Sequence, residues 1–448
     1  MRHFDLVIVG TGVAGRTAAE EAARAGLSTA VVDCRPFGGT CALRGCEPKK
    51  ILAAAAEVPL RVRGQRGHGV IGDARLDWPE LVAFKHRYTD GLSEAFEAGM
   101  REAGQTPLHG VARFSAAGTL EIGGVTYSAD AILLGTGAKP TPLAMPGEEL
   151  LVDAEAFMEL AELPERIAFV GGGFISFEFA GIAAAAGRRP VVLHRSQHPL
   201  KGFDPDLVDV LIKQYAEWGV DVRVNTPVAG VRRGGDAHDA PFVVDLAEGS
   251  FVPADLVVHG AGRVPDLGAL DLAAGGVEFG PHGVAVDGGM RSVSNERVWA
   301  AGDAAAIGRP LTPVAIAQAR VAVANIVSPH SAVWDPAVVP SAVFSQPPLC
   351  AVGLSESDAR SRGLDVDVKL TDTSDWLSSQ RVGLAHTAAK TIVARSTGRL
   401  LGAHVLGHNA EEVANLFALA IAAEQTVADL KRTLWTYPTA SSEIVYLL

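Results

Sequence analysis

Short apolar runs alternate with alanine-rich or polar segments along most of the chain. They cover residues 5–9, 28–32, 131–134, 166–170 and 190–193, and glycines followed by a helical pattern come after the first and the fourth. Apolar runs of this length predict strands, and the segments with helical spacing predict helices. Strands and helices that alternate in this order are typical of an α/β fold.

The pattern changes twice along the chain. Residues 78–103 have helical periodicity, and we expect a long helical excursion there. From about residue 336, strand-like runs such as 349–352 and 388–394 mix with helical segments such as 410–424. We therefore predict a C-terminal α+β region after the α/β part.

Composition limits the kinds of protein that this chain can be. Its 448 residues are enough for three or four domains with full-sized cores. The formal net charge of −12, without any basic run, argues against a nucleic-acid partner. The first strand begins at once, which leaves no room for a signal peptide, and no apolar run reaches the roughly 18 residues of a membrane span. We expect a soluble cytoplasmic protein without a membrane partner.

A complete dinucleotide-binding fingerprint follows the first strand. Gly10, Gly12 and Gly15 precede an alanine-rich helical run, and Asp33 ends the second strand. The glycines permit a tight turn and a close approach of the backbone to a pyrophosphate at a helix N-terminus. The acid accepts a hydrogen bond from a ribose hydroxyl. Because strand, helix and acid are all in register, this segment predicts a Rossmann-like domain.

Two cysteines lie five positions apart in a glycine-rich stretch just after this unit, and four cysteines in all do not form a disulfide framework. On a regular helix, the side chains of Cys41 and Cys46 would diverge too far to bond. A disulfide therefore needs an irregular turn, which Gly45 can supply and Pro48 can help to close. A bridge in strained, accessible backbone is easily reduced, as catalytic disulfides are. The alternative is two buried cysteines that act as small apolar residues.

A second glycine fingerprint follows the strand at 166–170. Its second strand ends in His194 where an acid is expected, and Arg195 and Lys201 come after it. A carboxylate would repel a 2′-phosphate, whereas a guanidinium and an ammonium attract one, so the segment predicts an NADPH site. The alternative is that both cations are solvated surface charges. The other residues of this fingerprint are Gly171, Gly173 and Ser176.

The cysteine stretch resembles the redox signature of the class I pyridine nucleotide–disulfide oxidoreductases, which include glutathione, mycothiol and mercuric reductases and lipoamide dehydrogenases. The resemblance covers nearly the whole chain. It implies that the first fingerprint binds FAD, that Cys41 is the interchange thiol and that Cys46 is the charge-transfer thiol against the flavin. It also implies that Lys49 pairs with Glu178 beside the flavin, although a glutamate there could equally lie on the solvated face of an ordinary helix.

The resemblance also implies further site residues and a domain order. The FAD-binding residues that it adds are Gly39, Thr40, Gly137, Gly302 and Asp303, and Gly262 joins the NADPH site. The implied domains are an FAD-binding domain (1–148), an NADPH-binding domain (149–268), a central domain that completes the FAD site (269–334) and an interface domain that forms a homodimer (335–448). We assign no metal site.

The C-terminal tail departs from the family pattern. Glutathione reductases and lipoamide dehydrogenases carry a histidine and, five residues later, a glutamate, which act as general acid and base for the thiols. This chain has Tyr437 and Ser442 at those places, with Glu443 one place late. A phenol with a pKa near about 10 is a poor base at neutral pH, but it can donate a proton or a hydrogen bond. The alternative is that Tyr437 only packs at the dimer interface.

The residues expected to contact the substrate fit glutathione only in part. Arg320 matches an arginine that binds a glutathione carboxylate, whereas Glu20 stands where a second arginine is expected and would repel the same group. We therefore expect an enzyme that passes electrons from NADPH through FAD and the Cys41–Cys46 disulfide to a small disulfide less anionic than glutathione disulfide. Two alternatives stay: a mercuric-type or other metal-ion reductase with a soft-metal acceptor, and a flavin-based redox sensor with little turnover.

Overall fold

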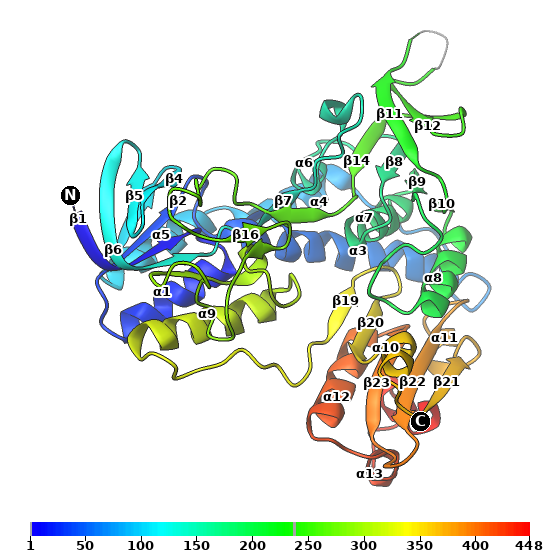
Figure 1. The fold of residues 1–448 in the computed structure, drawn as a ribbon. Helices are drawn as coiled ribbons and strands as arrows, with labels where there is room; N and C mark the ends of the chain where they lie inside the picture. Colours follow the sequence, from blue (N-terminus) through cyan, green and yellow to red (C-terminus); the bar gives the residue numbers. More distant parts are fainter. Residues whose placement is uncertain (1, 236–238) are drawn as a thin grey trace. The chain divides into compact units, whose positions relative to one another are not determined.

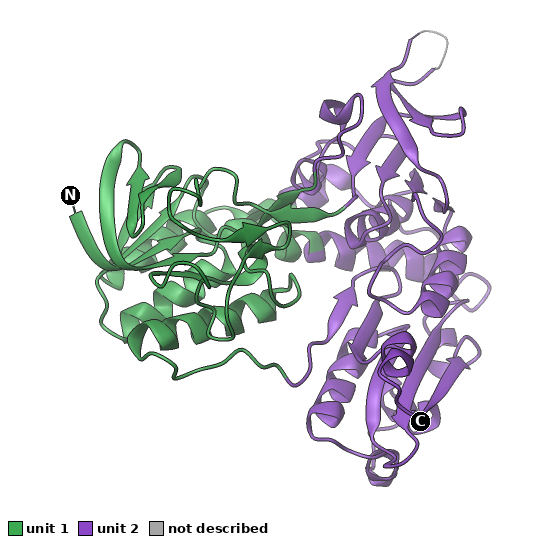
Figure 2. Cartoon of the chain, in the orientation of Figure 1, with its two compact units in different colours: residues 1–49, 84–141, 262–336 green, residues 50–83, 142–261, 337–448 purple. Residues whose placement is uncertain are grey.

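The computed structural model describes residues 2–235 and 239–448 (Figure 1). The chain forms two compact units, and each unit gathers three separate segments of the sequence (Figure 2). Unit 1 holds residues 1–49, 84–141 and 262–336, and unit 2 holds residues 50–83, 142–261 and 337–448. Each unit is therefore held together by contacts between segments that are far apart in the sequence.

Unit 1 is built on a seven-stranded sheet. Its strands are β1 (Arg2–Val9), β2 (Thr29–Asp33), β3 (Thr106–His109), β4 (Ala112–Ala116), β5 (Thr119–Ile122), β6 (Val125–Leu134) and β18 (Val298–Ala300). The order is β3-β2-β1-β6-β5-β4, and β18 pairs with β6. The pairs among β3, β2, β1, β6 and β18 are parallel, whereas β6, β5 and β4 form an antiparallel meander. The parallel strands therefore share one carboxyl edge, where ligands bind in sheets of this kind.

Small residues allow two helices to pack closely in this unit. Helices α1 (Val13–Arg24) and α9 (Thr312–Val327) lie side by side (Figure 1). Their buried faces carry alanines such as Ala18 and Ala322, and β1 buries Leu6 and Ile8 completely. Alanine combines the best helix propensity with the smallest side chain, so the alanine-rich pattern explains this close layer.

The predicted helical excursion over 78–103 is two helices rather than one. Helix α4 (Trp78–Thr89) ends before α5 (Leu92–Glu102) begins. Gly91 lies between them with φ of 78°, a left-handed conformation that glycine adopts at little cost. The remaining elements of unit 1 are α2 (Gly39–Arg44), β7 (Ala138–Pro140), β15 (Arg263–Pro265), β16 (Phe279–Gly280), β17 (Gly283–Val284) and η2 (Gly302–Ala304), and α3 (Cys46–Gly64) has residues in both units.

Unit 2 contains a second parallel sheet. Its strands are β8 (Arg166–Val170), β9 (Arg189–Leu193), β10 (Asp221–Arg223) and β14 (Leu256–His259), in the order β10-β9-β8-β14. Helix α7 (Phe174–Ala185) is buried from Ile175 to Ala185, which explains why its sequence is apolar on every side. The elements near this sheet are η1 (Glu148–Leu150), α6 (Ala154–Met158), α8 (Pro205–Glu217) and an antiparallel sheet of β11 (Val228–Arg233), β12 (Phe242–Leu246) and β13 (Phe251–Ala254).

The C-terminal part of unit 2 is a five-stranded antiparallel sheet with helices, as predicted. Its order is β19-β20-β23-β22-β21. The strands are β19 (Ser341–Val343), β20 (Leu349–Gly353), β21 (Val366–Asp372), β22 (Ala388–Ala394) and β23 (Leu400–Leu406). The helices are α10 (Glu356–Ser361), α11 (Leu377–Gln380), α12 (Ala410–Ala422), α13 (Val427–Arg432), η3 (Ala440–Glu443) and α14 (Ile444–Leu447).

The α/β fold class with two Rossmann-like sheets and an α+β region is thereby confirmed. Within residues 2–235 and 239–448, no helix combines the length and the apolar character that crossing a membrane requires. The limits of the four domains stay a prediction.

Candidate active site

The first glycine turn is tied to the acid that ends the neighbouring strand. Thr11 lies between Gly10 and Gly12, and its backbone N–H and its hydroxyl both donate to one carboxylate oxygen of Asp33, at 2.8 and 2.6 Å. The N–H of Gly38 donates to the Thr11 hydroxyl at 3.1 Å. The structure therefore places Asp33 beside the glycine turn, and Thr11 is a link that the sequence did not reveal.

Backbone segments approach so closely at this turn that side chains cannot fit. A Cβ on Gly10 would lie 2.3 Å from the carbonyl oxygen of Gly135, and a Cβ on Gly39 would lie 2.3 Å from the Cα of Gly12. A Cβ on Gly15 would lie 1.8 Å from the carbonyl oxygen of Gly10. Gly10 also has φ of 101° and Gly39 φ of 72°, which favour glycine. Three glycine-containing segments thus form one cradle of bare backbone in unit 1.

This cradle fits a dinucleotide such as FAD. Helix α1 has no side-chain cap at Gly12, so the N–H groups of its first turn suit a phosphate. The hydroxyl of Thr136 is buried without a hydrogen-bond partner in the described part of the chain. Burial raises the pKa of Asp303, and the nearby Arg263 lowers it. A ligand rich in hydroxyl groups would satisfy such buried oxygens.

The other predicted FAD residues of unit 1 lie on these same segments. Thr40 is in the first turn of α2, and Lys49 is in the first turn of α3. Gly137 has φ of 69° directly before β7, and Gly302 has φ of 68° at the start of η2. Both glycines therefore occupy turns whose backbone conformation favours glycine.

The two cysteines flank a break between two helices, as their spacing predicts. Helix α2 ends at Arg44, Gly45 adopts φ of −145° and ψ of −111°, and α3 begins at Cys46. A Cβ on Gly45 would lie 2.8 Å from the carbonyl oxygen of Thr40, so a side chain would clash there. The break replaces the regular helical spacing and allows Cys41 to make a hydrogen bond with Cys46.

Cys41 and Cys46 are free cysteines in the structure, and the disulfide between them stays a prediction. Cys46 is exposed, and Cys41 is half-buried with its Sγ 3.3 Å from the Thr312 hydroxyl oxygen. The hydrogen bond with Cys46 and burial raise the pKa of Cys41, whereas the Thr312 hydroxyl lowers it. Thr312 is the first residue of α9, so the N-terminal end of this helix lies beside Cys41.

A tyrosine and a glutamate join this site without having been predicted. Glu47 directly follows Cys46 in the first turn of α3, and the hydroxyl of Tyr88 near the end of α4 donates a hydrogen bond to its carboxylate. Glu47 is visible in the cysteine stretch, but its partner lies 41 residues away. No local pattern of the sequence signals such a contact.

The second glycine turn has the same link between turn and strand end, with a different residue. The N–H of Gly172 donates to Nδ1 of His194 at 3.1 Å. Because Nδ1 accepts, the proton of the neutral ring lies on Nε2, which is 2.8 Å from the Ser196 hydroxyl and 3.2 Å from the carbonyl oxygen of His198. Burial lowers the pKa of His194, which keeps the ring neutral.

The predicted NADPH residues of unit 2 lie in this turn or follow it in the sequence. Gly171 has φ of 102°, and its carbonyl oxygen accepts a hydrogen bond from the hydroxyl of Ser176 at 2.5 Å. Helix α7 has no side-chain cap at Gly173. Arg195 and Lys201 are exposed beyond the end of β9, and neither forms an ion pair with any residue that the structure describes. Gly262, with φ of 107°, lies in the turn before β15, in unit 1.

Glu178 is buried rather than solvated. Its side chain is in α7, the residue is 2% exposed, and one carboxylate oxygen accepts a hydrogen bond from the N–H of Phe344 at 3.0 Å. The alternative of an ordinary surface glutamate is therefore wrong. Lys49 belongs to the other unit, and its pairing with Glu178 stays a prediction.

In the C-terminal tail, Ser442 and Glu443 form hydrogen bonds within unit 2. The Ser442 hydroxyl donates to the carbonyl oxygen of Thr439 at 2.7 Å, and it accepts from the Thr439 N–H at 3.1 Å, which completes the capping box of η3. The carboxylate of Glu443 accepts from the hydroxyl of Ser378 at 2.5 Å and from its N–H at 3.3 Å. Tyr437 is 78% exposed, and its hydroxyl has no hydrogen-bond partner among the described residues.

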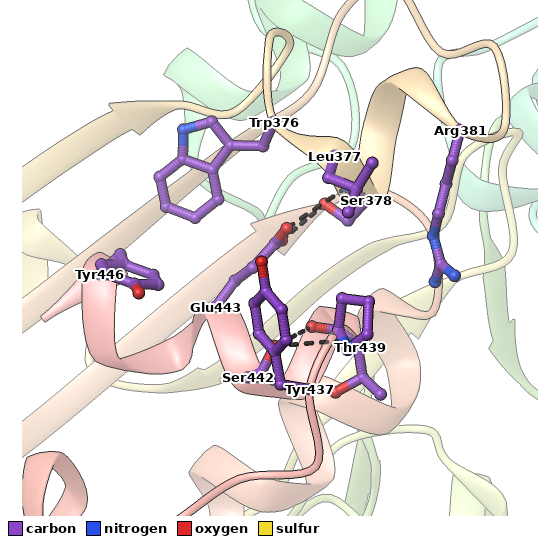
Figure 3. Close-up of a pocket in the computed structure, with 10 residues that line it drawn as sticks. Trp376, Leu377, Ser378, Arg381, Tyr437, Thr439, Ser442, Glu443 and Tyr446 are labelled. Carbon is purple, nitrogen blue, oxygen red and sulfur yellow. Dashed lines mark hydrogen bonds between the residues drawn. The ribbon is translucent and has the colours of Figure 1, made fainter.

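These tail residues line a cavity of about 180 Å³ (Figure 3). In the close-up, the dashed lines join Glu443 to Ser378 and Ser442 to Thr439, and none reaches Tyr437. The residues that line the cavity are Trp376, Leu377, Ser378, Arg381, Tyr437, Pro438, Thr439, Ser442, Glu443 and Tyr446. Among the residues that the structure describes, Tyr437 therefore has no acidic partner that could replace the missing dyad.

The predicted substrate residues lie in a mixed network of charges on unit 1. The guanidinium of Arg320 is 3.4 Å from the carboxylate of Glu21. Arg24 contacts the carboxylates of both Glu21, at 2.7 Å, and Glu20, at 3.8 Å. The arginine expected to bind a substrate carboxylate is therefore already paired with an acid of its own chain.

Comparison with known proteins decides the family. Residues 4–324 match the family described as pyridine nucleotide-disulphide oxidoreductase, and residues 339–448 match the dimerisation domain of that family. The chain belongs to the pyridine nucleotide-disulphide oxidoreductases. This oxidoreductase is 33% identical over 446 residues to a glutathione reductase of Burkholderia cepacia, with 99% of this chain and 98% of that protein covered. It is 32% identical over 457 residues to the chloroplastic/mitochondrial glutathione reductase of Pisum sativum, with 99% and 82% covered.

Solved structures show the same fold. The HOCl-induced flavoprotein disulfide reductase RclA of Escherichia coli, as a Cu(II) complex, matches with a TM-score of 0.89 at 24% identity. The match covers 100% of this chain and 99% of that one. At this identity the likeness concerns the fold alone.

The oxidoreductase is therefore a FAD-dependent disulfide oxidoreductase, and FAD and NADPH are its cofactors, as in the glutathione reductases of the family. The predicted enzyme class and cofactors are confirmed at this level. The roles of single residues stay predictions.

Proposed function

We propose that the oxidoreductase catalyses NADPH + H⁺ + R–S–S–R → NADP⁺ + 2 R–SH, where R–S–S–R is a small disulfide less anionic than glutathione disulfide. The observation that carries the proposal is the break at Gly45, which brings Cys41 and Cys46 into hydrogen-bond contact. The similarity to glutathione reductases supports a disulfide acceptor.

The two thiols perform the exchange in two balanced steps. The Cys41 thiolate attacks one sulfur of R–S–S–R, the S–S bond breaks, and one R–S⁻ leaves and takes up a proton. The Cys46 thiolate then attacks the Cys41 sulfur of the mixed disulfide, which forms the Cys41–Cys46 bridge and releases the second thiol. The resulting disulfide is regenerated to the dithiol by two electrons that originate from NADPH.

FAD supplies the electron transfer between NADPH and the Cys41–Cys46 pair when it is bound. In unit 1, the residues proposed to hold FAD are Gly10, Gly12, Gly15, Asp33, Gly39, Thr40, Lys49, Gly137, Gly302 and Asp303. The residues proposed to hold NADPH are Gly171, Gly173, Ser176, Arg195, Lys201 and Gly262. Glu178 is proposed to orient Lys49 toward the flavin.

The NADPH preference rests on the charges at the second glycine turn. His194 is buried and neutral and accepts from Gly172, so the turn is satisfied without a carboxylate. Arg195 and Lys201 are exposed beyond the same strand, where charge-assisted hydrogen bonds to a 2′-phosphate can form. A carboxylate in place of His194 would repel that phosphate.

A homodimer completes the proposal. Residues 339–448 match the dimerisation domain, and the tail exposes large side chains, with Leu434 at 98% and Tyr437 at 78%. We propose that Tyr437 reaches the dithiol of a second subunit and donates a proton or a hydrogen bond to the thiols. Replacement by Phe should leave the reduction of FAD by NADPH unchanged and slow the thiol steps by about 100-fold, at the low end of general acid catalysis. Stopped-flow traces of the two half-reactions separate these effects, and an unchanged oxidative half-reaction would make Tyr437 a packing residue.

The acceptor is tested by NADPH consumption with a panel of disulfides, Hg(II) and quinones. We expect turnover with at least one small disulfide that is lost in both Cys41→Ser and Cys46→Ser. Disulfide turnover that survives Cys41→Ser would contradict the dithiol cycle. Turnover with Hg(II) alone would favour a metal-ion reductase, and negligible turnover with every acceptor would favour a redox sensor.

A further inference from the structure

The dithiol site contains a hydrogen-bonded pair that the exchange steps do not use. Glu47 directly follows Cys46, and the Tyr88 hydroxyl donates to its carboxylate. Tyr88 is 46% exposed, so the pair reaches the surface of unit 1. A charge-assisted hydrogen bond from a phenol holds the Glu47 carboxylate in a defined place, one residue from Cys46.

The pair and the interchange thiol influence one another electrostatically. The pKa of Tyr88 is raised, mainly by its hydrogen bond with Glu47, and the negative charge of Cys41 adds to this effect while Arg16 lowers it. The charge of Glu47 in turn raises the pKa of Cys41, after the larger effects of the Cys46 hydrogen bond and burial. Glu47, Tyr88 and Cys41 therefore lie close enough to share one electrostatic environment.

The arginine predicted to bind a substrate carboxylate belongs to a network in which each arginine is paired with an acid. Arg320 is paired with Glu21, and Arg24 contacts both Glu20 and Glu21. Two arginines thus face two glutamates, and the network has no surplus positive charge to offer to a substrate carboxylate. Arg24 and Arg320 are thus both paired with acids, and the cation that acts on the Glu47–Tyr88 pair is Arg16, whose charge lowers the pKa of Tyr88.

We propose that Glu47 is a specificity residue for the electron acceptor, that Tyr88 positions it, and that its charge favours small disulfides carrying ammonium groups over dianionic ones. The inference rests on the proposed disulfide reductase function. Neither residue exchanges atoms or electrons with the acceptor, so the balance of the reaction is unchanged.

The first test measures kcat/KM of the holoenzyme for three disulfides that differ in charge: cystamine (dicationic), hydroxyethyl disulfide (neutral) and glutathione disulfide (dianionic). We expect the order cystamine, hydroxyethyl disulfide, glutathione disulfide. Glu47→Gln should lower the ratio of kcat/KM for cystamine to kcat/KM for glutathione disulfide by about tenfold or more. This is the effect expected from one unit charge at roughly 6 Å near a protein surface. High salt should shrink this difference because the site is exposed.

Two further variants separate charge from structure. Tyr88→Phe keeps the Glu47 carboxylate but removes the hydrogen bond that holds it. The cystamine to glutathione disulfide ratio should therefore fall by about twofold to threefold, because interactions of exposed charges are typically worth less than about 1 kcal/mol. Glu102→Gln removes an equal charge from the exposed end of α5 and should leave the ratio unchanged. A merely structural role of Glu47 would lower kcat/KM for all three disulfides alike.

The second test does not depend on turnover. The NADPH-reduced holoenzyme is alkylated with iodoacetamide, which is neutral, and with iodoacetate, which is anionic, and the modified Cys41 is measured by mass spectrometry. Glu47→Gln should raise the ratio of iodoacetate to iodoacetamide rates by about fivefold to tenfold. An unchanged ratio of alkylation rates, or an unchanged order of disulfides in Glu47→Gln, would overturn the inference. If no disulfide is turned over, the proposed function fails, and the alkylation ratio still decides the role of Glu47.

Discussion

The two glycine turns of this oxidoreductase share one backbone design and differ in one charge. In unit 1, the N–H of Thr11 donates to Asp33 at the end of β2, and in unit 2 the N–H of Gly172 donates to His194 at the end of β9. Both strand ends therefore satisfy a turn N–H, but one does so with a carboxylate and the other with a neutral imidazole. The structure shows that a strand-end side chain can hold the turn without a carboxylate, as His194 does. The second role of the acid, to bind a ribose hydroxyl, is a prediction for Asp33, and under it His194 removes the charge that would repel a 2′-phosphate.

The largest expected effect comes from filling either turn. Gly10→Ala would place a Cβ 2.3 Å from the carbonyl oxygen of Gly135, and Gly171→Ala would place one 2.5 Å from the Cα of Ala261. Contacts this short force the backbone to move, at a cost of about 3 kcal/mol or more. We expect Gly10→Ala to lose bound FAD, whereas Gly171→Ala should keep FAD and lose its reduction by NADPH at least about 100-fold.

Absorbance of bound flavin and stopped-flow reduction by NADPH distinguish the two variants. Gly26→Ala is the matched control, since Gly26 also has positive φ, at 74°, but a Cβ there meets no atom within 4 Å. It should cost only about 1–2 kcal/mol of stability through backbone strain. If both turn variants lose FAD alike, the two turns do not serve separate cofactors.

The next largest expected effect is on the preference of the enzyme for NADPH over NADH. Replacing Arg195 and Lys201 together by Ala should lower kcat/KM for NADPH by some tens- to hundreds-fold, or about 2–4 kcal/mol, because both charge-assisted contacts to the 2′-phosphate are lost. The value for NADH should change little. His194→Asp should add repulsion and favour NADH further. Equal efficiency of the unaltered enzyme with NADH and NADPH would contradict the assignment.

The smallest expected effect is a pH dependence that comes from His194 in the second turn. Burial, followed by the charges of Lys201 and Arg195, lowers the pKa of His194, while the carbonyl of His198 raises it. A histidine whose pKa is lowered by folding binds protons more readily in the unfolded chain. Its contribution to stability is therefore present above the unfolded pKa of about 6.5 and is lost as the pH falls through the folded pKa, by about 1.4 kcal/mol per unit of difference.

Thermal unfolding of the holoenzyme as a function of pH checks this expectation. His194→Asn keeps an acceptor for the Gly172 N–H but does not titrate, so its melting temperature should fall less than that of the unaltered enzyme below about pH 6.5. Parallel pH profiles of the two proteins would show that His194 is not the titrating group.

The features that the sequence predicted are those that a short segment of backbone determines. Gly10, Gly45 and Gly171 mark places where no side chain fits, and the apolar runs beside them form the parallel strands. The break between Cys41 and Cys46 follows from helix geometry, because a regular helix cannot bring side chains at this spacing together. These requirements are local, and a single sequence expresses them clearly.

The features that the sequence did not predict depend on packing between distant segments. The hydrogen bond between Tyr88 and Glu47 joins α4 to α3, and Glu178 meets the N–H of Phe344, 166 positions further along the chain. Whether Glu178 was buried could not be decided from its own helix, because α7 is apolar on all sides and offers no contrast between faces. Contacts of this kind need the folded arrangement of the unit.

The dithiol cycle is tested most directly by counting and mapping thiols in the holoenzyme before and after NADPH is added. The chain has four cysteines, of which Cys34 and Cys350 lie outside the cysteine stretch. After denaturation under trapping conditions, the oxidised enzyme should show thiols at Cys34 and Cys350 only, and a peptide with a Cys41–Cys46 bridge. One equivalent of NADPH should expose two further thiols, at Cys41 and Cys46. An oxidised enzyme in which Cys41 and Cys46 are already titratable, with no gain on adding NADPH, would contradict the cycle.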